Sequence, residues 1–124
     1  MAVDPKISDI QRFKQEDTGG PVVMLNLVRF KQDGGRTTYK EYANAVLPFL
    51  KKVGGQPLYV GDCSTPLVGE PGQLWDAVLL VRYPNRSAFL QMAMDPEYQH
   101  VSKLRTAALE EAVLQATTPW PGSP

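Results

Sequence analysis

The sequence predicts a single α+β domain in which an antiparallel sheet carries its helices on one face. Two stretches, residues 21–30 and 75–83, are apolar almost without interruption, whereas a strand with one face in water alternates apolar and polar residues. After an extra N-terminal helix, the expected order is β-α-β-β-α with a possible final strand, which is the split βαβ, ferredoxin-like order. Because the helices cover one face only, we expect a second copy to bury the other face and complete a dimeric α+β barrel.

Residues 1–20 are expected to form the extra helix and a linker. A helix over residues 5–15 is indicated by Pro5, which suits a first helical position, and by an apolar stripe at helical spacing. Asp4 is the expected N-cap of this helix. Residues 18–21 (TGGP) then end it and lead into the first strand.

The first strand is followed, after a short turn, by a long amphipathic helix. Thr38 and Glu41 have the spacing of a capping box at its start. Pro48 lies inside the helix, where it removes one backbone donor. The pair Gly54-Gly55 predicts an end in the left-handed conformation.

Two further strands are expected over residues 56–63 and 75–83, joined by a loop rich in proline and glycine. The tail TTPWPGSP, residues 117–124, could add a short edge strand before the prolines from Pro119 onward end regular structure. The barrel domain is therefore expected to span residues 21–119. A flexible tail would occupy residues 120–124.

Two helices are expected after the third strand. Asn85 or Ser87 can cap the first of them. Asp95, as an N-cap, and Pro96, at the first helical position, then start a second helix. We expect this last helix to continue to about residue 116.

The composition excludes several classes of protein. Thirteen basic residues balance thirteen acidic ones in a chain of 124 residues, so no broad field favours nucleic acid or a membrane surface. One cysteine, Cys63, and one histidine, His100, cannot supply a structural zinc site, and we expect no metal and no cofactor. No apolar run approaches a membrane span, and the first residues lack the pattern of a secretion signal. We therefore expect a cytoplasmic protein.

Arg105 is the most informative polar residue. On the last predicted helix it shares, with Tyr98, the face meant for the sheet. A buried guanidinium needs a carboxylate, several carbonyls or a bound anion. Two interpretations stay open. Arg105 forms an internal clamp with Asp62, Asp76 or Glu70, or it binds a carboxylate or enolate-like oxygen of a ligand.

Three residues of the predicted strands are further candidates for binding a small molecule. Asn26 interrupts the most apolar strand, so its amide is expected to be hydrogen-bonded. Its partner lies either across the sheet or dimer seam, or on a substrate carbonyl. Arg29 follows on the opposite face of the same strand, and Trp75 is large enough to line a pocket.

Asp62 and His100 are the candidates for proton transfer. Asp62 ends the second strand beside apolar neighbours, which would raise its pKa and suit a general base; a turn-forming role is the alternative. His100 is the sole histidine and lies away from the centre of the apolar helix face. It therefore either faces solvent or, where a partner covers it, acts as an acid or base.

An ordered set of residues resembles a known bacterial family. The set comprises Tyr42, Pro48, Gly54-Gly55, Gly61, Leu67-Val68-Gly69, Tyr83-Pro84, Ala88-Phe89, the run DPEYQ that begins at Asp95, and Arg105. Over residues 21–119 the chain is similar to the family labelled domain of unknown function 1330, within the dimeric α+β barrel superfamily. The resemblance implies a ferredoxin-like subunit, a barrel-forming homodimer, and a shared structural or pocket role for Tyr98 and Arg105.

The superfamily contains small monooxygenases and isomerases as well as non-catalytic members, so the resemblance leaves two functions open. The first is a homodimer that binds a small, partly apolar metabolite. The alternative is a cofactor-free enzyme, monooxygenase- or isomerase-like, acting on a small carbonyl-containing or aromatic metabolite. The residues expected to bind the small molecule are Asn26, Arg29, Trp75, Tyr98 and Arg105. In the enzyme, Asp62 or His100 would move a proton.

Overall fold

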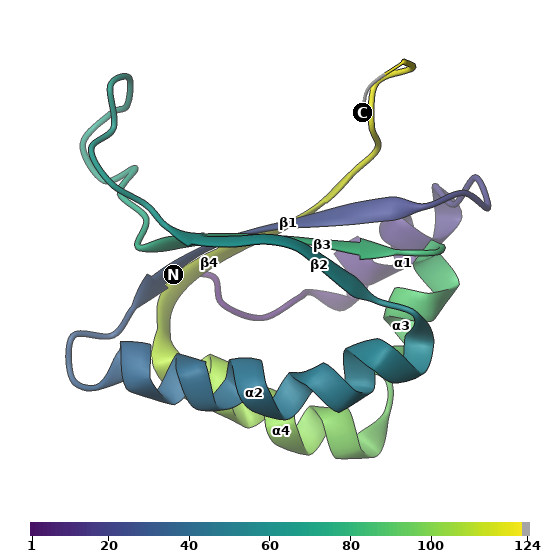
Figure 1. Ribbon diagram of the computed structural model, residues 1–124, viewed down its shortest axis with the longest axis horizontal. Coiled ribbons are helices and arrows are strands. Elements are labelled where there is room, and N and C mark those ends of the chain that lie inside the picture. The colour runs from purple at the N-terminus through teal and green to yellow at the C-terminus, as the bar shows by residue number, and fades with distance from the viewer. Residues whose placement is uncertain (123–124) are drawn as a thin grey trace.

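The computed structural model describes residues 1–122, which form four helices and a four-stranded antiparallel sheet. In chain order the elements are α1 (Ile7–Gln15), β1 (Val22–Phe30), α2 (Gly35–Val53), β2 (Gln56–Asp62), β3 (Ala77–Tyr83), α3 (Arg86–Ala93), α4 (Pro96–Ala108) and β4 (Leu109–Thr117). The strands lie in the order β2-β3-β1-β4. Figure 1 shows the helices gathered on one face of this sheet. The predicted α+β, ferredoxin-like fold is confirmed.

The two faces of the sheet explain the nearly continuous apolar runs. Side chains alternate along a strand. On β1 the even-numbered residues point toward the helices, and Val22, Met24 and Val28 among them are buried, whereas the odd-numbered residues point to the helix-free face. There, Leu25 lies opposite Leu80, and Leu27 lies opposite Val78. Both faces of the central strands therefore need cover, but only one receives it from the helices.

Helix α1 begins at Ile7 rather than at residue 5, and the prediction that Asp4 caps it is wrong. Lys6 takes the cap position without a side-chain hydrogen bond. The Asp4 carboxylate instead accepts a hydrogen bond from the Thr106 hydroxyl at 2.8 Å, because Val3 and Asp4 lie beside the last turn of α4. The helix is anchored further on, where the Phe13 ring meets the Phe89 ring edge-on at a centroid distance of 5.4 Å.

Helix α2 begins earlier than a capping box at Thr38 and Glu41 predicts. Its first residue is Gly35, and the Thr38 amide already donates to the Gly34 carbonyl inside the first turn. A Cβ on Gly35 would lie 2.6 Å from the Ala108 carbonyl oxygen, so the close approach of α2 to the end of α4 requires glycine. Pro48 lies inside the helix, and Gly54 ends it with a φ of 78°, as predicted.

The last helix is much shorter than predicted. Asn85 and Asp95 cap α3 and α4 as expected, but α4 stops at Ala108 instead of about residue 116. Residues 109–117 form β4, which pairs with β1 along its whole length. The physical reason is the free edge of β1: its backbone groups need a partner, and the apolar residues of this segment also recur with a strand period of two.

The final strand is therefore β4, which ends at Thr117. The possible edge strand in the tail does not form, since residues 118–120 have no regular structure. Residues 120–122 are exposed and irregular, and the last two residues of the predicted tail lie outside the described residues. Within residues 1–122, no helix is long and apolar enough to cross a membrane.

Candidate functional site

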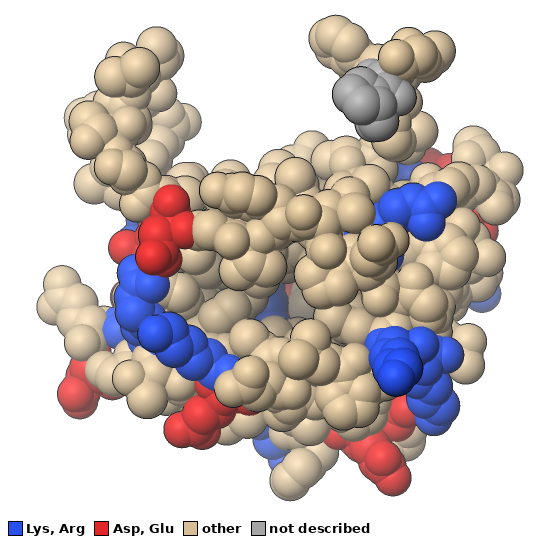
Figure 2. Space-filling model, in the orientation of Figure 1, with Lys and Arg blue, Asp and Glu red and all other residues tan. Residues whose placement is uncertain are grey.

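A cavity of about 1160 Å³ lies between the helix-covered face of the sheet and the helices. Figure 2 shows the surface hollowed between the sheet and α2, with basic atoms visible inside. Much of the wall is apolar, with Leu79 and Leu114 from the sheet and Phe89 and Met92 from α3. This composition is usual for sites that hold a small organic molecule.

Arg105 provides the buried charge of this wall. Its side chain comes from the sheet-facing side of α4, and the residue is only 7% exposed. Nη1 donates to the Val3 carbonyl oxygen at 2.7 Å, and the Asp4 carboxylate lies 3.8 Å away. Nη2 is buried and has no hydrogen-bond partner in residues 1–122. The guanidinium is therefore held on one side and free on the other.

The carboxylates proposed as clamp partners for Arg105 do not fill that role. Asp62 pairs with Arg36, and Asp76 accepts a hydrogen bond from the Phe30 amide at 2.8 Å, beside the end of β1. Glu70 belongs to the loop that joins β2 and β3. The carboxylate nearest to Arg105 comes instead from the N-terminal segment, about a hundred residues away in the sequence.

Three tyrosines surround the same region. The Tyr42 and Tyr98 hydroxyls are hydrogen-bonded at 2.8 Å, which joins α2 to α4. Burial raises the pKa of Tyr42 well above its usual value, and also raises the pKa of Tyr39. The positive charge of Arg105 opposes both shifts, so these phenols lie within its electrostatic reach. At neutral pH this wall presents O–H groups, not phenolates.

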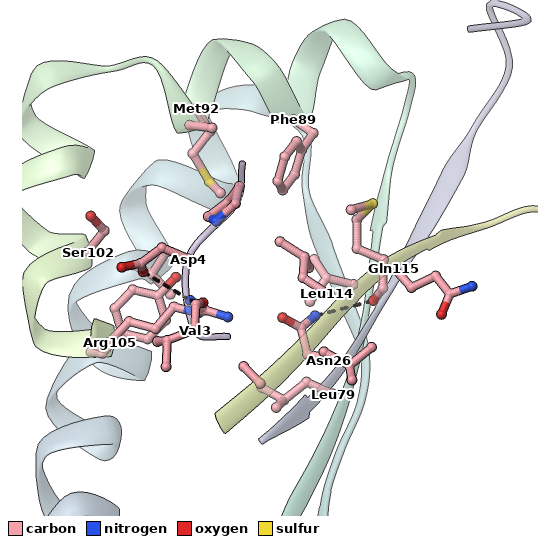
Figure 3. Close-up of a pocket in the computed structure, with 18 of the residues that line it drawn as sticks. Val3, Asp4, Asn26, Leu79, Phe89, Met92, Ser102, Arg105, Leu114 and Gln115 are labelled. Atoms are coloured by element: carbon pink, nitrogen blue, oxygen red, sulfur yellow. Dashed lines mark hydrogen bonds and ion pairs between the residues drawn. The ribbon is translucent and has the colours of Figure 1, made fainter. Parts of the chain in front are cut away.

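Asn26 lies across the cavity from Arg105. It occupies the middle of β1, opposite Leu79 on β3 and Leu114 on β4. Its Nδ2 reaches only the Met24 carbonyl, at a long 3.4 Å. Figure 3 shows the Arg105 and Asn26 side chains extending toward one another from opposite walls. The Asn26 amide is therefore a half-buried polar group that the sheet contributes to the cavity wall.

Asp62 lies at the exposed rim, and the expectation that its pKa is raised is wrong. Its carboxylate lies 2.7 Å from the Arg36 guanidinium, and that hydrogen bond and charge lower its pKa. Its side chain is 72% exposed, so apolar neighbours do not desolvate it. Asp62 is thus an ionised carboxylate at the mouth, which makes it a weaker base than the sequence indicates.

Arg29, Trp75 and His100 do not line this cavity. Arg29 lies on the helix-free face, where it forms an ion pair with Glu111 and stacks over the Trp75 ring at 5.5 Å. His100 is exposed on α4. The structure thus brings Asn26, Asp62, Tyr98 and Arg105 to one cavity and places the other three candidates elsewhere.

The N-terminal segment is the part of the site that the sequence analysis missed. The Ala2 carbonyl accepts a hydrogen bond from the Ala112 amide of β4 at 2.9 Å, and the next two residues contact Arg105. Residues 2–4 therefore form a strap beside the buried guanidinium. No side-chain pattern in the sequence predicts the contacts of this strap, because two of its three hydrogen-bond or ion-pair acceptors, those of Ala2 and Val3, are backbone carbonyls. Tyr39 and Tyr42, in contrast, have the i, i+3 spacing of one helix face.

Within residues 1–122, no group of three or more histidine, cysteine, aspartate or glutamate side chains is placed to hold a metal ion. The acidic residues of the cavity, Asp4, Asp9, Glu16 and Asp62, are all exposed. The chemistry of the buried wall is therefore one cation, several hydroxyls and one amide.

The observations define a ferredoxin-like α+β protein with a cavity between its sheet and its helices. The chain belongs to the family described as Domain of unknown function (DUF1330), whose sequence profile matches residues 31–117. The resemblance seen in the sequence is thereby confirmed. Among the curated proteins, none matches the chain.

Solved structures show the same fold. A protein of unknown function from Rhodopseudomonas palustris has a TM-score of 0.88 at 31% identity, covering 95% of this chain and 96% of that one. A hydroxynitrile lyase from Passiflora edulis has a TM-score of 0.67 at 13% identity, covering 86% of this chain and 99% of that one. A dimeric ferredoxin-like protein of unknown function from Bacteroides fragilis has a TM-score of 0.56 at 17% identity, with coverages of 79% and 95%. The last two likenesses show the fold alone.

Proposed function

We propose that this protein is a homodimer that binds a small, partly apolar metabolite in the cavity between its sheet and its helices. The observation that carries the proposal is the buried Arg105, with its unpartnered Nη2, in an otherwise largely apolar cavity of about 1160 Å³. An unsatisfied buried polar group is costly, and a bound molecule is one way to satisfy it. The apolar wall would hold the rest of that molecule.

Binding accounts for the geometry better than proton transfer by the two expected residues. Asp62 is an exposed, ion-paired carboxylate at the rim, and His100 does not line the cavity. A general acid or base must come within hydrogen-bond distance of the reacting group. One observation favours the cofactor-free enzyme as a second candidate. The Tyr42–Tyr98 hydroxyl pair and Arg105 line the same cavity and could stabilise a developing oxyanion.

The homodimer is supported by the helix-free face of the sheet. Its central row is apolar, and the half-exposed side chains of Leu25, Leu27 and Leu80 lie side by side across β1 and β3. In Figure 1, the loop between β2 and β3 and the segment after β4 both project on this side. These two segments carry fully exposed Leu67, Val68 and Trp120. A second copy would bury this apolar row of side chains and would also contact the two projecting segments.

A cavity-filling variant tests the binding function. Leu79→Trp places an indole in the cavity, whereas Leu79→Met keeps the volume nearly unchanged and serves as the matched control. A thermal-shift screen of small carbonyl-containing and aromatic compounds should yield compounds that raise the Tm of the wild type and of Leu79→Met, but not of Leu79→Trp. Hits that raise the Tm of all three proteins equally would contradict binding in this cavity.

A turnover assay on the same hits separates the two candidate functions. A compound that binds and is recovered unchanged supports the binding protein. Conversion of a hit by the wild type but not by Tyr98→Phe would favour the enzyme, since this change removes one hydroxyl of the buried pair.

A further inference from the structure

The buried Nη2 of Arg105, which has no hydrogen-bond partner within residues 1–122, indicates the class of molecule that fits the cavity. The residue is more than nine-tenths buried, Nη1 is occupied by the Val3 carbonyl, and Nη2 is unpartnered within residues 1–122. Figure 3 shows the guanidinium reaching from α4 into the cavity toward Asn26. A neutral acceptor could satisfy the N–H group, but only an anion also balances the buried charge.

The contact with Asp4 does not remove this need. The carboxylate lies 3.8 Å from Nη1, which is beyond hydrogen-bond distance, and its side chain is 57% exposed. It also accepts a hydrogen bond from the Thr106 hydroxyl at 2.8 Å. Solvent therefore screens its charge, and Asp4 balances the guanidinium only in part.

The groups around Arg105 favour an acceptor as well. In the Tyr42–Tyr98 pair one hydroxyl donates to the other, so the accepting tyrosine keeps a proton for another partner. Tyr39 is buried close enough for its pKa to respond to the charge of Arg105. Across the cavity, the Asn26 Nδ2 donates to the Met24 carbonyl at 3.4 Å, and the amide oxygen lies on the side of Arg105 in Figure 3. This part of the wall is rich in donors and contains no buried carboxylate.

We propose that the cavity takes a small monocarboxylic acid, whose carboxylate pairs with Nη2 of Arg105 and whose apolar body lies against Leu79, Phe89 and Leu114. This inference rests on the proposed function and names its ligand class. A single buried guanidinium, already shared in part with Asp4, matches one negative charge. A phosphate monoester would bring a second charge that no other buried cation of the wall balances.

The proposal is tested with 2-naphthoate and its neutral isostere 2-naphthamide, titrated calorimetrically into the full chain at neutral pH. Charge-assisted hydrogen bonds are the stronger ones, so naphthoate should bind at least about tenfold more tightly than the amide. Arg105→Gln should abolish this preference. Lys103→Gln, which removes an exposed positive charge from the same helix, is the matched control and should preserve it.

A second variant keeps the test decisive if Arg105→Gln does not fold. Asp4→Asn removes the exposed carboxylate that competes for the guanidinium, so it should tighten naphthoate binding by about two- to fivefold and leave naphthamide binding unchanged. If Arg105 had only a structural role, naphthoate affinity would not fall in Arg105→Gln and rise in Asp4→Asn.

The outcomes separate this inference from the proposed function. Equal binding of naphthoate and naphthamide to the wild type, or an unchanged naphthoate affinity in Asp4→Asn, would overturn the carboxylate assignment and leave the binding function standing. Binding of neither compound would overturn the carboxylate assignment, and a thermal-shift screen without any hit would overturn the binding function as well.

Discussion

The two faces of the sheet bury apolar side chains in different ways. The helix-covered face packs Val28 and Met92 into the core, but it also encloses Arg105, four tyrosines and the Asn26 amide around a cavity. The helix-free face has an apolar centre, with charge confined to its margin, as in the Arg29–Glu111 ion pair. One face therefore has the character of a ligand site and the other that of an interface between proteins.

This contrast follows from what can cover each face. Helices supply long polar side chains that reach over the sheet and leave space between the layers, so a polar group such as Arg105 can face Asn26 across the cavity. A second sheet supplies side chains at a nearly constant height, which favours flat apolar contact. Successive residues of the same strands therefore face two different environments.

The largest effect is expected from placing one charge on each face in turn. Val28→Asp puts a carboxylate at a position that is 0% exposed, which should cost several kcal/mol out of a total stability of about 5–15 kcal/mol. Leu80→Asp changes the helix-free face, so the subunit should stay folded while the dimer dissociates. Circular dichroism should show the loss of structure in the first variant only.

Sedimentation at low micromolar concentration completes this comparison. The wild type should sediment at twice the chain mass of 13.7 kDa, and Leu80→Asp at the mass of one chain. A wild type that is monomeric at this concentration would contradict the assignment of the helix-free face to a second copy. A folded Val28→Asp variant would contradict the difference between the faces.

An intermediate effect is expected from alkaline pH, because the helix-covered side buries phenols. Burial raises the pKa of Tyr39, Tyr42 and Tyr83 above their ordinary value of 10.0. A raised folded pKa means that the stabilisation is fully present below pH 10 and is lost as the pH rises through the folded values. In an absorbance titration, these tyrosines should ionise above pH 10, together with a fall in the free energy of unfolding. Ionisation of all five tyrosines near pH 10 in the folded protein would contradict their burial.

The smallest effect is expected at the rim of the cavity. Arg36 lowers the pKa of Asp62 below its ordinary value of 3.8, so this pair stabilises the fold above that pH and the contribution is lost as the pH falls. Because both groups are exposed, Arg36→Gln should leave the Tm nearly unchanged. An NMR titration should show the Asp62 pKa returning toward 3.8. A large drop in Tm would mean that the rim, and not only the buried wall, supports the fold.

Local signals predicted the start and the end of several elements. Asn85 and Asp95 were recognised as caps because their side chains satisfy amides only two or three residues away. The order of the elements, and with it the fold, also follows from local periodicity. Local periodicity does not predict the end of α4, because residues 109–116 contain no glycine or proline that would end a helix. They form a strand only because they pair with the free edge of β1.

The candidate site was predicted only in part for the same reason. The helical wheel placed Arg105 and Tyr98 toward the sheet, and Asn26 stood out as an amide in an apolar strand. The partners were not predictable, since the strap reaches Arg105 from 102 positions away and Asp62 meets Arg36 from a different element. The assignment of Arg29 and Trp75 to the opposite face became evident only once the strand register was known.

The sequence by itself therefore determined the family of this α+β protein and its elements up to the end of α4, because periodicity, caps and turn residues act over a few positions. The tertiary structure decided which face of each strand the helices cover, where the last helix yields to β4, and which group the buried guanidinium meets. Those outcomes depend on contacts between segments that are distant in the sequence, and such contacts contribute stability only in the folded chain.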